Sequence, residues 1–299
     1  LARAGAPILH DAMGGAAAGW LAGFFRHVGL PDLVVEMRGQ PDPMFYGVHP
    51  EPIAVNLAAT VERMTEDAGT PLFAVATDGD GDRLGVVVPG GAFFNSHQIF
   101  AVLLDRLQRA GGEGAVVKTF TVSRVIERLA ASRGLSVQET KVGFKYVADA
   151  MLKGNVLLGG EESGGIGVSA HLPERDGLAN ALLLMQSVAE SGESLTQRFA
   201  QIEREVGWRH AYDRLDLTLD SDERKERALA AVGAVDALAG RQVTSVERLD
   251  GVKLNLDADA WLLVRPSGTE PLLRIYCEAP DEAAVAATLA AARELATAG

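Results

Sequence analysis

Apolar runs alternate with amphipathic segments along the first two thirds of the chain. Runs rich in apolar residues, typical of strands buried on both faces of a sheet, occupy residues 72–76, 84–88, 115–118 and 155–158. Between them, apolar positions recur at helical spacing, which predicts amphipathic helices over 54–67, 122–129 and 178–189. This alternation of strand, loop and helix predicts α/β structure, in which helices cover the faces of mixed sheets.

The last third of the chain has a different pattern. Val252, Leu254 and Leu256 alternate with polar residues, and so do residues 273–277. A period of two predicts strands with one solvated face, and apolar positions over 285–295 predict a terminal helix. The predicted fold is therefore two mixed-sheet α/β domains sandwiched by helices, followed by a C-terminal α+β domain. The expected domains span residues 1–93, 94–208 and 209–299.

Composition and charge exclude several classes of protein. The chain has 28 Lys and Arg against 40 Asp and Glu, a formal net charge of −12, whereas binders of nucleic acid or anionic membranes usually carry a basic excess. Its single cysteine, Cys277, cannot form an internal disulfide. No run approaches the ~20 apolar residues that cross a bilayer, and no targeting segment is visible. We therefore expect no nucleic-acid or membrane partner, and a cytoplasmic location by default.

The strongest chemical feature is an acidic loop that follows the predicted strand at 72–76. Asp78, Asp80 and Asp82 alternate with glycines, and Arg83 follows them. Carboxylate oxygens are ligands that Mg²⁺ prefers, and an arginine beside a cation suits a phosphoryl group. An acidic surface turn without a ligand is the simpler alternative. An EF-hand fails because its sixth position would be Arg83 instead of glycine.

A second loop, at residues 159–165, also follows a predicted strand. It reads Gly-Gly-Glu-Glu-Ser-Gly-Gly. Glu161 and Ser163 place a carboxylate and a hydroxyl two residues apart, which could grip two neighbouring hydroxyls of a sugar. An ordinary glycine-rich turn is the alternative.

A third loop contains two arginines, two hydroxyls and a glycine that would expose backbone N–H groups. Such groups can surround a phosphate and donate hydrogen bonds to it. The residues are Arg265, Ser267, Gly268, Thr269 and Arg274. A capped β-turn with surface arginines is the alternative, and no Gly-Lys-Ser/Thr of a Walker loop occurs there.

Two weaker features lie between these loops. Lys145 could reach a phosphate or transfer a proton, although a lysine is more often a solvated surface residue. In the segment 173–177, Asp176 is expected to cap the helix that follows.

In this order, the three loops resemble those of one family, the α-D-phosphohexomutases, which are relatives of phosphoglucomutase and phosphomannomutase. Residues 77–83 resemble the metal-binding loop of this family, 160–164 its sugar-binding loop and 265–274 its phosphate-binding loop. Residues 45–57, 142–146 and 173–177 also match. The resemblance covers nearly the whole chain.

The resemblance implies a role for each of these groups. Asp78, Asp80 and Asp82 would hold Mg²⁺, and Arg83 would contact the transferring phosphoryl group. Glu161 and Ser163 would hold the sugar, and Lys145 is a candidate for acid–base help. The phosphate that is not transferred would bind at the third loop, on the following residues: Arg265, Ser267, Gly268, Thr269 and Arg274.

One departure from the family pattern affects the expected activity. Family members have four domains, and the first carries a phosphorylated serine in a Thr-x-Ser-His-Asn/Asp-Pro type motif. Here Ser96 and His97 are followed by Gln98, and they come after the metal loop instead of before it. We therefore assign the chain to domains two to four. Because it begins with Leu1, we interpret it as a fragment of a longer enzyme, and we expect the isolated chain to be inactive.

The resemblance implies a hexose phosphate mutase that interconverts the 1-phosphate and 6-phosphate of a hexose through a phosphoserine and a bisphosphate. Glucose phosphates are the expected substrates, with mannose or glucosamine phosphates as alternatives. A stand-alone sugar-phosphate-binding protein without mutase activity is a further alternative. A Mg²⁺-dependent phosphatase is disfavoured, because the glycine-separated aspartates suit metal ligation better than nucleophilic attack. The oligomeric state is left open.

Overall fold

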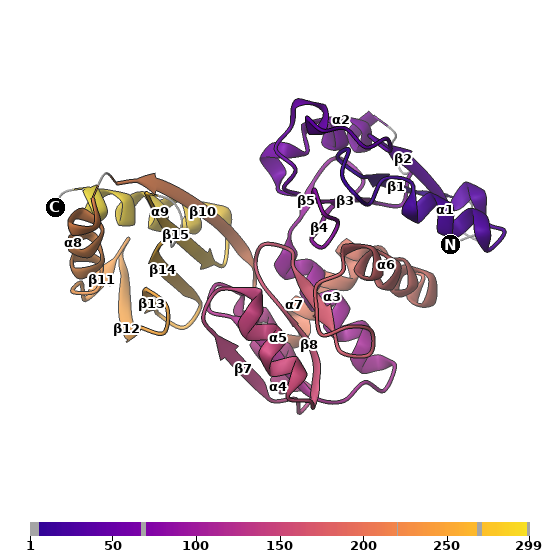
Figure 1. Ribbon diagram of the computed structural model, residues 1–299. Coiled ribbons are helices and arrows are strands. Elements are labelled where there is room, and N and C mark those ends of the chain that lie inside the picture. The colour runs from indigo at the N-terminus through magenta and orange to yellow at the C-terminus, as the bar shows by residue number, and fades with distance from the viewer. Residues whose placement is uncertain (1–5, 67–69, 220, 268–270, 298–299) are drawn as a thin grey trace. The chain divides into compact units, whose positions relative to one another are not determined.

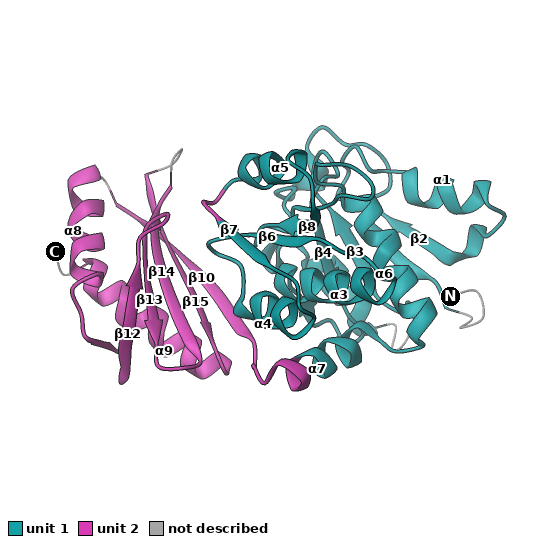
Figure 2. Ribbon diagram, turned by 90° about the horizontal axis from the view of Figure 1, so that it is seen from below, with its two compact units in different colours: residues 1–139, 143–202 teal, residues 140–142, 203–299 magenta. Residues whose placement is uncertain are grey.

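The computed structural model describes residues 6–66, 70–219, 221–267 and 271–297. The chain divides into two compact units, shown in different colours in Figure 2. Unit 1 contains residues 1–139 and 143–202, and unit 2 contains residues 140–142 and 203–299. The predicted domain boundaries near residues 93 and 208 stay predictions.

Unit 1 begins with a sheet in which parallel and antiparallel strands are mixed. Its strands are β1 (Ile8–Asp11), β2 (Val34–Met37), β3 (Ala74–Thr77), β4 (Leu84–Val87) and β5 (Phe93–Phe94), in the order β2-β1-β3-β4-β5. β1 is parallel to β2 and β3, whereas β3–β4 and β4–β5 are antiparallel. The helices α1 (Trp20–His27) and α2 (Ala58–Glu66) belong to this part of the unit, together with the short helices η2 (Pro31–Leu33), η3 (Phe45–Gly47) and η4 (Ala54–Asn56). As their apolar sequences predict, β3 and β4 are buried throughout.

A second mixed sheet follows in unit 1. It contains β6 (Ala115–Thr119), β7 (Val137–Thr140), β8 (Val156–Gly160) and β9 (Ile166–Val168), in the order β7-β6-β8-β9. Its helices are α3 (Ser96–Arg109), α4 (Arg124–Ser132), α5 (Phe144–Leu152), α6 (Gly177–Ser191) and α7 (Leu195–Val206) (Figure 1). β6 and β8 are parallel, and β8 and β9 are antiparallel. The glycine loop, residues 159–165, therefore connects the end of β8 to the start of β9.

Polar side chains set where several of these helices begin. The Asn95 side chain accepts a hydrogen bond from the Gln98 amide at 3.1 Å, and the Gln98 side chain accepts one from the Asn95 amide at 2.8 Å. This reciprocal pair is a capping box, which satisfies amides that have no partner within the helix. Ser96 and His97 therefore lie in the first turn of α3. The predicted cap of α6 is confirmed, because Asp176 accepts from the Ala179 amide at 2.9 Å.

Unit 2 contains one antiparallel sheet. Its strands are β10 (Ala211–Thr218), β11 (Ala237–Leu238), β12 (Arg241–Glu247), β13 (Val252–Leu256), β14 (Ala260–Pro266) and β15 (Leu272–Ala279), in the order β10-β15-β14-β13-β12-β11. The helices α8 (Asp222–Val232) and α9 (Glu282–Thr297) supply apolar side chains to the core on one face of this sheet. The two mixed sheets with their helices in unit 1, and the antiparallel sheet with its helices in unit 2, confirm the predicted fold class.

The prediction that one face of β13 is solvated is wrong. Lys253 and Asn255 alternate with leucines as expected, but they are only 2% and 6% exposed. The Lys253 ammonium lies 4.6 Å from the centroid of the Trp261 ring, and Asn255 donates to Ser245 and Glu247 of β12. Alternation of polar and apolar residues therefore separates the two faces of the strand, but neighbouring aromatic and polar side chains bury both.

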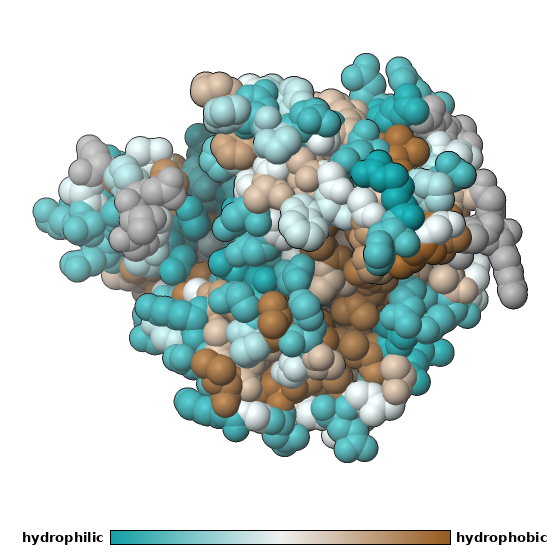
Figure 3. Space-filling model, turned by 45° about the vertical axis from the view of Figure 1, so that its right-hand side comes forward, coloured by the Kyte–Doolittle hydropathy of each residue, from teal (hydrophilic) through white to brown (hydrophobic). Residues whose placement is uncertain are grey.

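The surface combines charged side chains with scattered apolar ones. The face drawn in Figure 3 is mainly hydrophilic, with hydrophobic side chains gathered in patches. The exposed large hydrophobic residues include Trp20 and Phe24 on α1. Among the described helices, none has the length and hydrophobicity needed to cross a bilayer.

Candidate functional site

The aspartate loop connects β3 to β4 in unit 1. The carboxylates of Asp78, Asp80 and Asp82 each offer an oxygen, and these oxygens all lie within 4.8 Å of one another. Asp78 is buried, Asp82 is half-buried and Asp80 is exposed. Gly81 has a φ of +85°, a left-handed conformation that glycine adopts without strain. The loop can therefore turn sharply enough for the three side chains to converge, as the sequence predicted.

Asp78 is held from several directions. Its Oδ1 accepts hydrogen bonds from the amides of Gly81 and Arg83, each at 3.0 Å, and its Oδ2 accepts from Arg83 Nε at 2.6 Å. Arg83 also donates from Nη1 to Glu51 at 3.2 Å. The Arg83 guanidinium is therefore fixed between two carboxylates at the edge of the aspartate loop.

Asp82 has a different partner, which comes from the segment before α6. Arg175 Nη2 lies 2.6 Å from Asp82 Oδ2. Burial raises the pKa of Asp82 to about 6, Arg175 opposes this rise, and the charges of Asp78 and Asp80 add to it. Each of the two less exposed aspartates is therefore neutralised by an arginine.

Backbone hydrogen bonds tie the glycine loop and the segment before α6 to the aspartate loop. The Leu84 amide donates to the Gly164 carbonyl at 3.2 Å, and the Gly177 amide donates to the Gly81 carbonyl at 3.1 Å. A side chain at Gly164 would place its Cβ 2.6 Å from the Leu84 carbonyl oxygen, and the φ of Gly164 is +92°. The close approach of the loops therefore requires glycine at this position.

Glu161 is the most buried polar group of the glycine loop, at 7% exposure. Its Oε1 accepts from the Gly143 amide at 3.0 Å, just before α5, and its Oε2 lies 4.0 Å from Arg175 Nη1. Burial raises the pKa of Glu161 to about 7. The charge of Glu162 adds to this rise, whereas Arg175 and the Gly143 amide oppose it. Ser163 is half-buried in the same loop.

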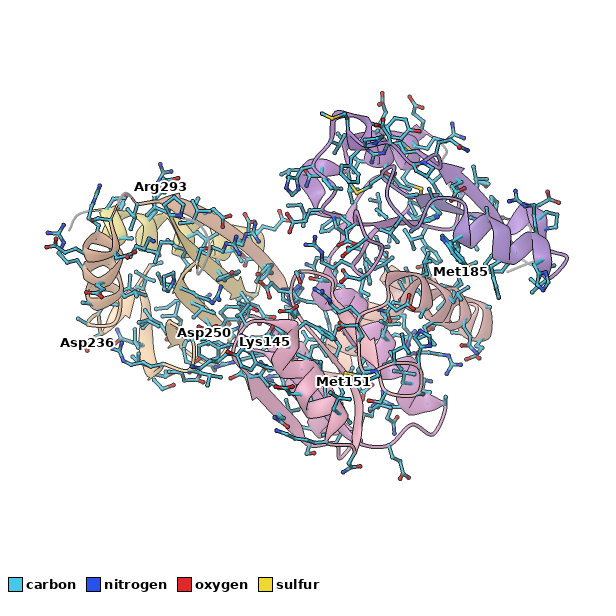
Figure 4. The ribbon with its side chains drawn as sticks, in the orientation of Figure 1. Lys145, Met151, Met185, Asp236, Asp250 and Arg293 are labelled. Atoms are coloured by element: carbon cyan, nitrogen blue, oxygen red, sulfur yellow. The ribbon has the colours of Figure 1, made fainter. Side chains whose placement is uncertain are left out.

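Lys145 lies in the first turn of α5 and is labelled in Figure 4. Its side chain is exposed, and its ammonium lies 4.9 Å from the centroid of the Tyr146 ring. Lys145 is therefore accessible to a ligand, but the structure gives it no contact with the aspartate loop.

The predicted phosphate loop belongs to unit 2. Arg265 on β14 and Arg274 on β15 are direct partners across the antiparallel pair. Arg265 Nε donates to Asp250 Oδ2 at 2.9 Å, and the same oxygen accepts from the Val142 amide at 2.9 Å. Asp250, labelled in Figure 4, lies in the turn between β12 and β13. The two arginines are thus brought together on one hairpin.

The hairpin end is only partly described. The Ser267 amide donates to the Leu272 carbonyl at 2.9 Å and closes the base of the turn. Gly268 and Thr269, which the sequence also assigned to phosphate binding, lie outside the described residues.

The aspartate loop fits a Mg²⁺ ion. Its donor set is three carboxylates, the hard oxygen ligands that Mg²⁺ favours, and one oxygen of each carboxylate lies within 4.8 Å of the other two. We conclude that Asp78, Asp80 and Asp82 could hold the cation and that Arg83 lies beside it.

Two residues of the site were missed by sequence reasoning. The sequence indicated only that Asp176 caps α6, and Arg175 was assigned no role. Glu51 lies in a Pro-Glu-Pro segment that matched the family pattern, but its contact with Arg83 was not foreseen. The signal that could have identified Arg175 is its position in one of the family-like segments, next to the helix cap.

The raised pKa of Glu161 predicts a pH-dependent stability. Relative to Glu161→Gln, the free energy of unfolding of the wild type is expected to fall by up to ~3 kcal/mol as the pH rises from about 5 to 8. The sign follows because the unfolded carboxyl ionises near its ordinary pKa, whereas the folded one keeps its proton until about 7. Stability that is present below the unfolded pKa is therefore lost as the pH rises through the folded pKa.

The measurement is urea-induced unfolding across this pH range in metal-free buffer. Glu226→Gln, on the exposed surface of α8, is the control and should follow the wild type. Parallel curves for the wild type and Glu161→Gln would contradict the prediction.

Comparisons with known proteins show the family to which the chain belongs. Models of the phosphoglucomutase/phosphomannomutase family match as alpha/beta/alpha domain II over residues 1–91, alpha/beta/alpha domain III over 95–206 and the C-terminal domain over 221–295. A phosphoglucomutase/phosphomannomutase of Thermococcus kodakarensis is 32% identical over 278 residues, which are 92% of this chain and 57% of the relative. A probable phosphoglucosamine mutase of Methanopyrus kandleri is 32% identical over 254 residues, 83% of this chain and 52% of the relative.

A solved structure shows the same fold. The putative phosphomannomutase from Thermus thermophilus superposes with a TM-score of 0.85 at 45% identity, covering 97% of this chain and 60% of that protein. The chain thus spans between half and two thirds of the length of these relatives. Three domain models of one family match it in sequence order, and the chain belongs to the phosphoglucomutase/phosphomannomutase family as its domains II, III and the C-terminal domain.

Proposed function

We propose that this chain supplies the cation-, sugar- and phosphate-binding parts of a hexose phosphate mutase, which interconverts the 1-phosphate and 6-phosphate of a hexose through a phosphoserine and a bisphosphate. One observation carries the proposal. Within unit 1, Arg175 lies between the aspartate loop and the glycine loop, 2.6 Å from Asp82 and 4.0 Å from Glu161. Groups suited to a phosphoryl transfer therefore lie next to a group suited to a sugar hydroxyl.

The aspartate loop would act on the transferring phosphoryl group. A Mg²⁺ ion held by Asp78, Asp80 and Asp82 would neutralise negative charge there. Arg83 would donate to the same phosphoryl oxygens, because its guanidinium is held at the edge of the loop by Asp78 and Glu51. A guanidinium fixed in advance loses little entropy when the substrate arrives.

The glycine loop would hold the sugar. Glu161 is oriented by the Gly143 amide, so its carboxylate would accept hydrogen bonds from sugar hydroxyls, and Ser163 would add a donor. A small set of contacts suits a bisphosphate that must bind in two orientations. Lys145, exposed at the start of α5, remains a candidate for acid–base help.

The hairpin of β14 and β15 would bind the phosphate that is not transferred. Arg265 and Arg274 lie opposite each other in register, and Ser267 lies at the base of the turn. Charge-assisted hydrogen bonds from two guanidinium groups are among the stronger contacts available to a phosphate. Such a local positive cluster explains how a chain of net charge −12 could bind an anion.

Glucose phosphates remain the proposed substrates, although the relatives are named for glucose, mannose or glucosamine phosphates. We further propose that a domain preceding this chain in the whole protein supplies the phosphoserine, since the chain spans only between half and two thirds of the length of its relatives. A cytoplasmic location remains part of this proposal.

The test compares binding with turnover. By calorimetry, the chain with Mg²⁺ is expected to bind glucose 1-phosphate weakly, and Glu161→Ala should weaken this binding by about 10-fold, as expected for a lost charged hydrogen bond. In a coupled assay with trace glucose 1,6-bisphosphate, the chain alone should give no turnover above background. The native polypeptide purified from its source should convert the 1-phosphate.

Competition among glucose, mannose and glucosamine 1-phosphates on that native protein would then identify the sugar. Absence of binding for all of them would contradict the proposal. A native polypeptide that binds sugar phosphates without converting any would indicate a binding protein instead of a mutase.

A further inference from the structure

The side chain of Arg175 packs against Gly165, where the absence of a side chain gives it space. A Cβ at Gly165 would lie 2.4 Å from Arg175 Cδ, so a side chain at residue 165 would displace the arginine. Arg175 and Gly167 form an antiparallel backbone bridge, and the guanidinium carbon lies 5.2 Å from the centroid of the Phe144 ring. The neighbouring residues therefore direct the Arg175 guanidinium toward Asp82.

The two arginines at the aspartate loop are held differently. Arg83 donates to Asp78 at 2.6 Å and to Glu51 at 3.2 Å. Arg175 has one close carboxylate, Asp82 at 2.6 Å, whereas Glu174 and Glu161 lie 3.5 Å and 4.0 Å away. Loss of Asp82 as a partner would therefore leave Arg175 only the two more distant carboxylates, whereas Arg83 would keep its hydrogen bond to Glu51 if Asp78 turned to a cation.

A cation at the aspartate loop would compete directly with Arg175. Asp82 Oδ2 forms the ion pair with the Arg175 guanidinium, and Asp82 also belongs to the set of carboxylates that would hold the ion. Two positive groups at one carboxylate repel each other. The Arg175 side chain is 29% exposed, so part of it is in contact with solvent.

We propose that Arg175 is a displaceable counter-ion of the aspartate loop: it neutralises Asp82 in the absence of a cation, and it turns to an anionic phosphoryl group when a cation occupies Asp82. This inference rests on the proposed cation site. Arg175 then lowers the affinity of the loop for a cation, and cation binding makes a guanidinium available to phosphate. Cation and phosphate should therefore bind with positive coupling, part of which depends on Arg175.

The first experiment measures Mn²⁺ affinity by electron paramagnetic resonance for the wild type and for Arg175→Gln, Arg175→Lys and Arg227→Gln. Removal of the competing charge in Arg175→Gln should tighten Mn²⁺ binding by about 5- to 20-fold, as expected for charges ~6 Å apart in a solvated site. Arg175→Lys keeps the charge and should stay close to the wild type. Arg227→Gln, exposed on α8, makes the same change in net charge and should have no effect.

Two failures are distinguishable in this experiment. Unchanged or weaker Mn²⁺ binding by Arg175→Gln, with normal binding by the wild type, overturns the inference, and weaker binding would mean that Arg175 positions Asp82 as a ligand. Absence of Mn²⁺ binding in the wild type overturns the proposed cation site itself.

The second experiment tests the coupling with inorganic phosphate as the probe. Saturating Mn²⁺ should tighten phosphate binding in both proteins, because the ion itself attracts phosphate, but by about 5-fold more in the wild type than in Arg175→Gln. Equal tightening in both proteins would show that Arg175 does not turn to the anion.

A third measurement does not depend on the folding of any variant. In the wild type with ¹⁵N-labelled arginine, addition of Mg²⁺ should shift the Arg175 side-chain resonance. The resonance of Arg198, which is held by the buried Asp105 at 2.6 and 2.7 Å, should not move. An Arg175 resonance that does not change at saturating Mg²⁺ would overturn the proposal.

Discussion

Replacement of Asp78 with asparagine is expected to weaken Mn²⁺ binding by at least about 100-fold, since loss of an outer-shell partner alone typically costs about 10- to 100-fold. Asp78 is 1% exposed, and its carboxylate is the most deeply placed of the three. Asparagine keeps the shape and one acceptor oxygen, so it can still accept from the Gly81 and Arg83 amides. It loses the negative charge that attracts the cation, and its amide group opposes Arg83 Nε.

Calorimetric or spectroscopic Mn²⁺ titration of the chain measures this effect directly. Asp32→Asn is a matched control, because it removes one negative charge from an exposed position in η2. Circular dichroism would show that Asp78→Asn is folded. Mn²⁺ binding within a few-fold of the wild type would rule out the aspartate loop as the principal cation site.

Replacement of Glu278 with leucine is expected to destabilise unit 2 by about 3–5 kcal/mol, the cost of leaving buried polar partners without their acceptor. Glu278 is fully buried on β15. Its Oε1 accepts from Trp208 Nε1 at 3.0 Å and pairs with His210 Nδ1 at 2.7 Å, and its Oε2 accepts from Trp261 Nε1 at 2.5 Å. Leucine fills the volume but accepts none of these hydrogen bonds.

Tryptophan fluorescence reports this change, because two of the three tryptophans of the chain contact Glu278. A Trp20→Phe background removes the signal of unit 1, and denaturant unfolding then follows unit 2. Glu278→Gln should lose less stability than Glu278→Leu, because its amide oxygen still accepts. Glu226→Leu on the surface of α8 is the control. Equal stability of Glu278→Leu and the wild type would mean that the carboxylate contributes no net stabilisation.

Asp78→Asn and Glu278→Leu test different parts of the molecule, the proposed cation site and the core of unit 2. Asp78→Asn tests a proposed cation ligand in unit 1 whose loss should leave the fold intact. Glu278→Leu tests a buried polar group in unit 2, on the sheet that carries the hairpin proposed to bind phosphate. Because Arg265 and Arg274 lie on this sheet, destabilisation of unit 2 should also reduce phosphate binding there, without change in Mn²⁺ affinity.

The sequence by itself determined the class of fold and the kinds of polar residues that the loops carry. Apolar runs at β3, β4 and β8 indicated strands buried on both faces, and all three are buried. Glycine-separated aspartates indicated convergent carboxylates, because glycines let the backbone turn sharply between them. Helix periodicity and the Asp176 cap were equally local, so they could be read from neighbouring residues.

Only the tertiary structure decided which charges meet and which strand faces are covered. Lys253 was expected to be solvated, because the alternation of residues in β13 cannot show that Trp261 lies over it. Arg175 was assigned no role in the sequence, because its partner Asp82 is distant along the chain and close only after folding. Periodicity and motif spacing depend on nearby residues, whereas ion pairs and burial depend on how distant segments pack, and this explains why the sequence identified the loops but not the arginine that connects them.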